Sequence, residues 1–130
     1  MVAIFYMSLV AQKGLSQIDP QIEMSVEMMR PPMAHNAMML TWYGEVLHGN
    51  FMANGERFNM NDPLIAASPL LPFGTKIELW YSGKKLVVEV KDRMPPGTPT
   101  NQLDLSKAGA RRLGFLVAGR VFALGKQLEN

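Results

Sequence analysis

The stretch TKIELWYSGKKLVVEVKDRMPP, residues 75–96, decides the fold. Apolar and polar side chains alternate over residues 75–81 and again over residues 85–91, which is the period of a strand with one buried face. Ser82 and Gly83 separate the two runs and are typical of a tight turn. The stretch therefore predicts a β-hairpin whose apolar face is turned toward a core.

Asp92 is the most informative polar residue of this stretch. It follows Val90 by two positions, so regular alternation places it on the same face as Leu86, Val88 and Val90. If that face is the interior, the carboxyl lies at the rim of an apolar core, where desolvation favours its protonated form. A carboxylic acid in that state can act as a general acid. The alternative is an acidic residue that ends the strand and caps the loop that follows.

Short strands with turn signals surround the hairpin. Residues 39–43 are rich in strand formers, and residues 119–124 have the pattern of a last strand. Ser106 is a typical N-cap for a helix over Lys107–Leu113, and Gly114 is a typical stop signal. Many short strands and one short helix indicate a small β-barrel.

Other polar and aromatic residues could take part in chemistry. Glu56, in a turn, could orient a substrate or share acid–base work, and is otherwise a solvated turn residue. Asp104 precedes the predicted helix, where its charge suits the helix dipole, and is interpreted as structural. The pairs Trp42-Tyr43 and Trp80-Tyr81 could stack on sugars or bases. One member of each pair should instead pack in the core, because neighbouring strand residues face opposite ways.

Composition limits the possible functions. The chain has 130 residues, no cysteine and a formal net charge of +2, which suits one domain and excludes disulfides and thiol chemistry. The only histidines are His35 and His48, so a three-histidine metal site is excluded and no cofactor is expected. The small charge gives no reason to expect a nucleic-acid partner. No apolar run is long enough to predict a transmembrane helix.

The N-terminal third differs from the rest of the chain. Residues 1–16 begin with an apolar segment that could be a secretory signal or a short buried strand. Six of the 11 methionines lie between Met24 and Met39, and Pro31-Pro32 interrupts any helix there. Residues 17–38 are therefore predicted to be a linker, which could be a flexible apolar segment or could bind a soft metal. Residues 39–126 are predicted to form the barrel domain.

Seven short motifs, in order along residues 40–124, resemble the rare lipoprotein A family. They are Thr41-Trp42-Tyr43-Gly44, Leu47-His48-Gly49, Ala53-Asn54-Gly55-Glu56-Arg57-Phe58, Ile65-Ala66-Ala67-Ser68, Leu71-Pro72-Phe73-Gly74-Thr75, Val90-Lys91-Asp92-Arg93-Met94-Pro95 and Leu103-Asp104-Leu105-Ser106. The resemblance implies a mainly β fold, a small six-stranded double-psi β-barrel with one or two short helices.

The resemblance also implies a function. It indicates an exported, monomeric protein of the periplasm or cell envelope that acts on peptidoglycan glycan strands. Active members resemble lytic transglycosylases, which cleave the bond between N-acetylmuramic acid and N-acetylglucosamine without water and leave a 1,6-anhydro end. The family's catalytic aspartate falls on Asp92 and its glutamate on Glu56. The residues expected to bind the substrate are Trp42, Tyr43, His48, Ser68 and Arg93.

Two departures from the family pattern favour a second function. Ser68 stands where the family has a histidine, and a serine cannot titrate near neutral pH. Met94 replaces a glycine and adds bulk beside Asp92. The alternative is a non-catalytic, expansin-like module that binds glycan and loosens the wall. A groove-facing His48 would favour the enzyme, whereas an ion pair between Asp92 and Arg93 would favour the binder.

Overall fold

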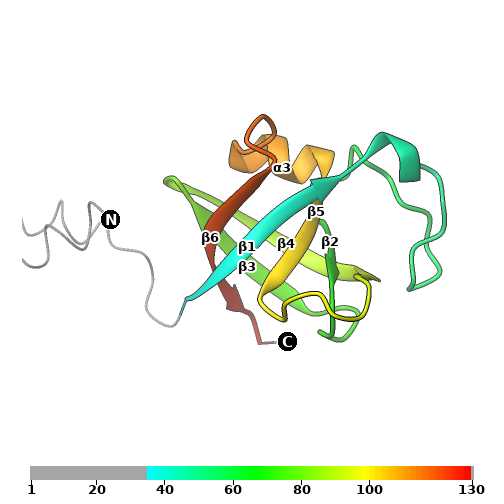
Figure 1. The fold of residues 1–130 in the computed structure, drawn as a ribbon, viewed down its shortest axis with the longest axis horizontal. Helices are drawn as coiled ribbons and strands as arrows, with labels where there is room; N and C mark the ends of the chain where they lie inside the picture. Colours follow the sequence, from blue (N-terminus) through cyan, green and yellow to red (C-terminus); the bar gives the residue numbers. More distant parts are fainter. Residues whose placement is uncertain (1–34, 130) are drawn as a thin grey trace, which may run out of the picture. The chain divides into compact units, whose positions relative to one another are not determined.

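Six strands form a closed barrel in the computed structural model, which describes residues 35–129. The strand order around the barrel is β1-β5-β2-β4-β3-β6 (Figure 1). The elements are β1 Asn36–Tyr43, η2 Glu45–Leu47, β2 Ile65–Ser68, β3 Lys76–Tyr81, β4 Lys84–Arg93, β5 Gln102–Ser106, α3 Lys107–Leu113 and β6 Arg120–Gln127. This confirms the predicted mainly β barrel with short helices. The predicted N-terminal segment, 1–16, and nearly all of the predicted linker lie outside the described residues.

The hairpin predicted from residues 75–96 is present as β3 and β4. The two strands pair antiparallel, with Ile77 opposite Val88 and Leu79 opposite Leu86. Ser82 and Gly83 both have positive φ, 50° and 79°. Two-residue hairpin turns whose twist matches that of the strands require positive φ at both positions. The apolar face of this hairpin therefore faces the barrel interior, as the alternation predicted.

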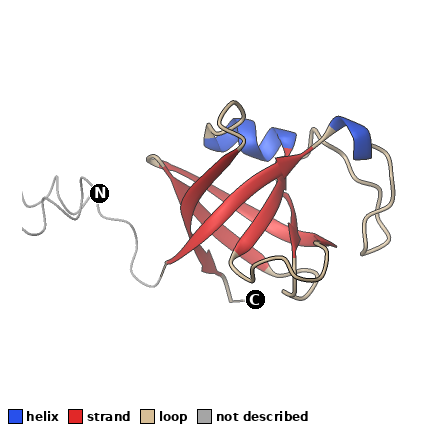
Figure 2. Cartoon of the chain, in the orientation of Figure 1, coloured by secondary structure: helices blue, strands red, loops and turns tan. Residues whose placement is uncertain are grey.

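Two groups of apolar side chains pack on opposite faces of the sheet. Side chains from all six strands and from α3 fill the interior. The helix α3 packs against β1, β4 and β5, and Figure 2 shows it beside the strands of the barrel. A smaller cluster, formed by Met52, Phe58 and Ile65 with Tyr43 and Met60 beside it, lies on the outer face. The segment between β1 and β2 therefore folds back onto the outside of the barrel.

The helix α3 has the bounds and caps that the sequence predicts. The Ser106 hydroxyl oxygen accepts a hydrogen bond from the backbone N–H of Gly109 at 3.0 Å, and Gly114 ends the helix with φ of 91°. The Ser106 hydroxyl also donates to the carbonyl of Asp62 at 2.6 Å. The N-cap therefore ties the β1–β2 segment to the barrel as well as starting the helix.

Strand β1 begins at Asn36, three residues before the predicted domain start. Residues 36–38 pair with β6, and the buried Met38 lies across from Ala123. Gly125 leaves room for this side chain, because a Cβ there would lie 2.2 Å from the Met38 sulfur. Met38 therefore belongs to a strand and packs in the core, although the methionine-rich composition predicted a linker up to this residue.

Candidate active site

Asp92 lies on the outer face of the barrel, and the interior position that regular alternation predicted is wrong. Ala66 pairs with Val90 and the next residue, Ala67, pairs with Asp92, so Lys91 is an extra residue in β4. An extra residue of this kind is a β-bulge, which interrupts the alternation of faces. Val90 is fully buried in the core, whereas Asp92 is half-buried on the other side of the sheet.

The two oxygens of the Asp92 carboxyl have different surroundings. Oδ1 accepts hydrogen bonds from the backbone N–H groups of Ala53 and Arg93, both at 2.9 Å. Oδ2 receives a longer contact from the Tyr43 hydroxyl, at 3.4 Å. The two backbone donors fix the orientation of the carboxyl, and Oδ2 is the oxygen with capacity left for a substrate.

Asp104 lies beside Asp92 on the same outer face. The register places Asp104 opposite Ala67 on one side and opposite Thr41 on the other. The Thr41 hydroxyl donates to Asp104 Oδ1 at 2.9 Å. Burial raises the pKa of Asp104 and the charge of Asp92 raises it further, while the Thr41 hydrogen bond acts in the opposite direction.

The interpretation of Asp104 as a purely structural residue missed this neighbour. Its own motif carried the signal, since Asp104 stands between Leu103 and Leu105, which are both fully buried. A polar residue between two interior leucines must face outward. What the sequence could not show was that the bulge brings Asp92 to that same face.

Tyr43 contacts Asp92, and the charges of both carboxyls act on its hydroxyl. Its ring stacks on Phe58 with centroids 4.4 Å apart, and its hydroxyl points to Asp92. Burial, followed by the charges of Asp92 and Asp104, raises the pKa of Tyr43 well above its usual value. The phenol is therefore a neutral hydrogen-bond donor at physiological pH.

Glu56 lies on a turn that docks directly on the bulge. The backbone N–H of Asn54 donates to the Lys91 carbonyl at 3.2 Å, next to the bond between Ala53 and Asp92. Glu56 is exposed, and its carboxylate accepts hydrogen bonds from Lys91 Nζ at 3.0 Å and from the Asn54 side chain at 3.2 Å. These two contacts and the Lys91 charge lower the pKa of Glu56. The structure thus brings Glu56 and Asp92 to one edge of the barrel.

Trp42 and Ser68 have partners away from this edge. The Trp42 indole N–H donates to the carbonyl of Leu116 at 3.1 Å and its ring packs against the interior core. Ser68 is fully buried, and its hydroxyl oxygen accepts backbone N–H groups from Leu70 at 3.3 Å and Leu71 at 3.0 Å. Both side chains therefore support the fold at the positions where the resemblance placed substrate contacts.

Arg93 and His48 flank the site without joining the carboxyls. The Arg93 guanidinium donates to the Ser68 carbonyl at 3.0 Å and lies 4.6 Å from the centre of the Phe73 ring. Arg93 contacts Asp92 through its backbone N–H. Among the described residues, no ion pair joins the side chains of Arg93 and Asp92. His48 is exposed, and its Nδ1 accepts the backbone N–H of Met60 at 3.1 Å.

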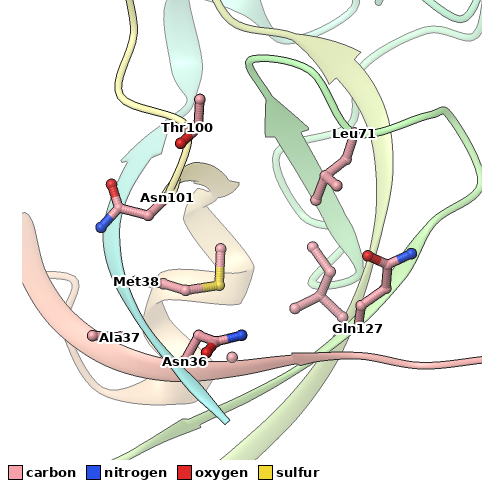
Figure 3. Close-up of a pocket in the computed structure, with 9 residues that line it drawn as sticks. Asn36, Ala37, Met38, Leu71, Thr100, Asn101 and Gln127 are labelled. Carbon is pink, nitrogen blue, oxygen red and sulfur yellow. The ribbon is translucent and has the colours of Figure 1, made fainter. Parts of the chain in front are cut away.

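The pocket shown in Figure 3 lies apart from this site. It has a volume of about 210 Å³ and is lined by Asn36, Ala37, Met38, Leu71, Ile77, Thr100, Asn101, Gly125 and Gln127. None of the predicted site residues lines it. Within residues 35–129, no three His, Asp or Glu side chains form a group that could hold a metal ion, and no helix could cross a membrane.

A family model described as "Lytic transglycolase" matches residues 35–122. The chain belongs to this lytic transglycolase family. The match covers the barrel from β1 into β6 and confirms the resemblance to rare lipoprotein A. Asp92 and Asp104 therefore both lie within the residues that match the lytic transglycolase family.

Curated relatives carry matching names. The chain is 43% identical over 81 residues to the "Probable endolytic peptidoglycan transglycosylase RlpA" of Synechocystis sp., which is 61% of this chain and 25% of that protein. It is 37% identical over 81 residues to the endolytic peptidoglycan transglycosylase RlpA of Neisseria meningitidis, 61% of this chain and 33% of that protein. The chain thus spans a quarter to a third of the length of these relatives.

Solved structures with the same fold are more distant in sequence. A Streptomyces papain inhibitor superposes with a TM-score of 0.62 at 23% identity, over 76% of this chain and 98% of that one. An expansin from Clavibacter michiganensis superposes with a TM-score of 0.60 at 20% identity, over 74% of this chain and 51% of that one. These likenesses support the double-psi β-barrel fold of the lytic transglycolase domain.

Proposed function

We propose that this domain is an endolytic peptidoglycan lytic transglycosylase in which Asp92 is the general acid and base. Its substrate is the bond between N-acetylmuramic acid and N-acetylglucosamine, and its product carries a 1,6-anhydro end. The observation that carries the proposal is the Asp92 carboxyl, whose Oδ1 is fixed by two backbone N–H donors and whose Oδ2 is left for a substrate. The family and the names of the relatives support the same reaction.

The reaction needs two proton transfers and no water. The oxygen that leaves the muramic acid C1 must gain a proton, and the C6 hydroxyl that attacks C1 must lose one. A single carboxyl can perform both steps in turn if it is held in one orientation against the bond. The hydrogen bonds from Ala53 and Arg93 supply that orientation at Asp92.

Neighbouring side chains suit the recognition of a sugar. The neutral Tyr43 hydroxyl makes only a long contact with Asp92, at 3.4 Å, so it can turn its proton to a substrate oxygen while its ring stays fixed by Phe58. Glu56 and Lys91 present a carboxylate and an ammonium group at the rim, where sugar hydroxyls and N-acetyl groups can hydrogen-bond. The proposed substrate also implies export to the periplasm or cell envelope.

A second candidate is a glycan-binding, wall-loosening module without turnover. The observation that favours it is Ser68, which stands where the family has histidine and whose buried hydroxyl accepts bonds from Leu70 and Leu71. No titratable group is supplied from that position. The missing ion pair between Asp92 and Arg93 favours the enzyme instead, because the carboxyl is not neutralised by its neighbour.

The test is digestion of purified peptidoglycan with the full chain, followed by chromatographic detection of anhydro-muropeptides. We expect products from the parent and none from Asp92→Asn. Glu45→Gln is the matched control, because it removes a carboxylate that pairs with Lys107 on the exposed surface. Binding to peptidoglycan without anhydro products in the parent would overturn the enzyme and establish the binding module.

A further inference from the structure

The outer face carries two neighbouring carboxyls, Asp92 and Asp104. We propose that Asp104 is the general acid that protonates the leaving oxygen and that Asp92 is the base that takes the proton from the attacking hydroxyl. This inference rests on the proposed function and divides its two proton transfers between two side chains. In this inference Asp104, which lies in β5 ahead of α3, is a catalytic residue as well as a charge near the helix start.

The strand register places the two carboxyls on either side of one small residue. Asp92 on β4 and Asp104 on β5 both lie opposite Ala67 on the intervening β2. Neighbouring strands are about 4.8 Å apart, so the two Cα atoms are separated by about 10 Å. Carboxyl pairs that act on opposite sides of a glycosidic bond are typically about 5–10 Å apart. Because both side chains leave the same outer face, a Cα separation of this size allows their carboxyl groups to lie within that range.

The surroundings of the two carboxyls suit opposite roles. Burial is the main cause that raises the pKa of Asp104, and this favours the proton-bearing form that an acid needs. Asp92 instead accepts two backbone N–H bonds through one oxygen. A pair of carboxyls in contrasting environments is the usual arrangement for separating an acid from a base.

Asp104 is held in place by a short chain of hydrogen bonds. The Thr41 hydroxyl donates to its Oδ1 at 2.9 Å, and the Gln102 side-chain amide donates to the Thr41 oxygen at 3.3 Å. Because Oδ1 is used as an acceptor, Oδ2 is the oxygen left to carry the acidic proton.

The proposed step balances without a further reactant. Asp104 gives its proton to the glycosidic oxygen as the bond from that oxygen to C1 of muramic acid breaks. The C6 oxygen of the same sugar then bonds to C1, and its proton passes to the Asp92 carboxylate. Exchange with solvent restores the proton to Asp104 and removes it from Asp92.

Two titratable groups face Asp104 from the elements packed against it in the described part of the chain. They are Asp92 on β4 and Tyr43 on β1, whose hydroxyl contacts Asp92 at 3.4 Å and whose pKa is raised by both carboxyl charges. Tyr43 stays neutral, so of these two groups only Asp92 contributes a charge, which raises the pKa of Asp104 in addition to the larger effect of burial. The alkaline limb of the reaction rate should therefore report on Asp104.

The test measures anhydro-muropeptide formation by the full chain against pH, for the parent, Asp104→Asn, Asp104→Glu and Thr41→Val. We expect Asp104→Asn to lower the rate about a hundredfold or more, while its binding to insoluble peptidoglycan and its unfolding transition persist. Asp104→Glu should recover part of the rate. Thr41→Val should move the alkaline limb to higher pH, because the hydrogen bond it removes lowers the pKa of Asp104.

The outcomes separate this inference from the proposed function. An active parent with an Asp104→Asn variant of similar rate and the same alkaline limb would overturn the role of Asp104 and leave the lytic activity standing. A parent that forms no anhydro ends would overturn both. An Asp104→Asn variant that fails to fold shifts the decision to Thr41→Val and Asp104→Glu, where an unmoved alkaline limb in both would contradict the inference.

Discussion

The charges of both Asp92 and Asp104 raise the pKa of Tyr43. The role of its hydroxyl can be tested without removing the ring. Replacing Tyr43 with Phe keeps the ring that stacks on Phe58 at 4.4 Å and removes the donor to Asp92. The bond is long, at 3.4 Å, so the free energy of unfolding should change by no more than about 1 kcal/mol. The rate of anhydro-product formation should fall about tenfold, the effect of losing roughly 1.4 kcal/mol in the transition state. An unchanged rate would show that the hydroxyl takes no part.

The partly buried carboxyl of Asp104 should lower the free energy of unfolding near neutral pH. A group whose pKa is raised in the folded state stabilises the fold fully below its ordinary value, 3.8 for Asp104, and loses that stability as pH rises through the folded value. The ionised form that replaces the protonated one as pH rises toward 7 is a partly buried charge, so Asp104→Asn should raise the free energy of unfolding there. The gain should disappear below pH 3.8. Urea unfolding at the two pH values measures it, and a variant less stable than the parent at pH 7 would contradict the burial argument.

Glu56 can be compared with a carboxylate of similar exposure. Glu56 pairs with Lys91 at the site, and Glu45 pairs with Lys107 on η2 and α3. The pKa of each glutamate is lowered, first by the hydrogen bond from its lysine, so both pairs persist as pH falls to the ordinary value of 4.5 and weaken only below it. We expect Glu56→Gln to weaken binding to peptidoglycan several-fold and Glu45→Gln to leave it unchanged. Equal effects would show that Glu56 contributes only surface charge.

At the scale of elements, the N-cap of α3 also anchors the segment that carries Glu56. Ser106 is buried, accepts the N–H of Gly109 and donates to the Asp62 carbonyl. Ser106→Ala removes the cap and leaves that carbonyl without its donor, so the free energy of unfolding should fall by about 2 kcal/mol. Thr98→Ala is the control, since its hydroxyl bonds only within an exposed turn, and should change stability by less than about 0.5 kcal/mol. Chemical unfolding of the two variants decides between them.

Elements with strong local signals were predictable from the sequence. The β3–β4 hairpin follows from alternation and a two-residue turn, and α3 follows from Ser106 and Gly114 at its ends. Strand β2 gave no such signal, because its four residues are all buried and do not alternate. A strand that is covered on both faces shows no period by which it could be recognised.

The candidate site was harder to predict than the helices and strands, because one extra residue in β4 changes the face on which Asp92 lies. Lys91 is the extra residue of the bulge, and it reverses the face of Asp92 relative to the count from Val90. The pairing of β4 with β2 creates the bulge, and such pairing between distant segments has no local pattern. The motifs pointed to Asp92 and Glu56, which the structure brings to one edge of the barrel, whereas the position of Asp104 beside Asp92 depends on the closed barrel.

At the scale of the whole molecule, the first residues of β1 should be needed for full stability of the barrel domain. A fragment of residues 39–130 lacks Asn36, Ala37 and Met38, which pair with β6, and so loses the buried Met38 side chain that fills the space over Gly125. Removing a buried side chain of this size costs about 2–5 kcal/mol, a large part of the stability of a small domain. A fragment of residues 35–130 keeps the strand and should unfold at a clearly higher urea concentration than residues 39–130. Equal midpoints for the two fragments would show that the barrel is equally stable without residues 36–38 of β1, and would support a domain that starts at residue 39.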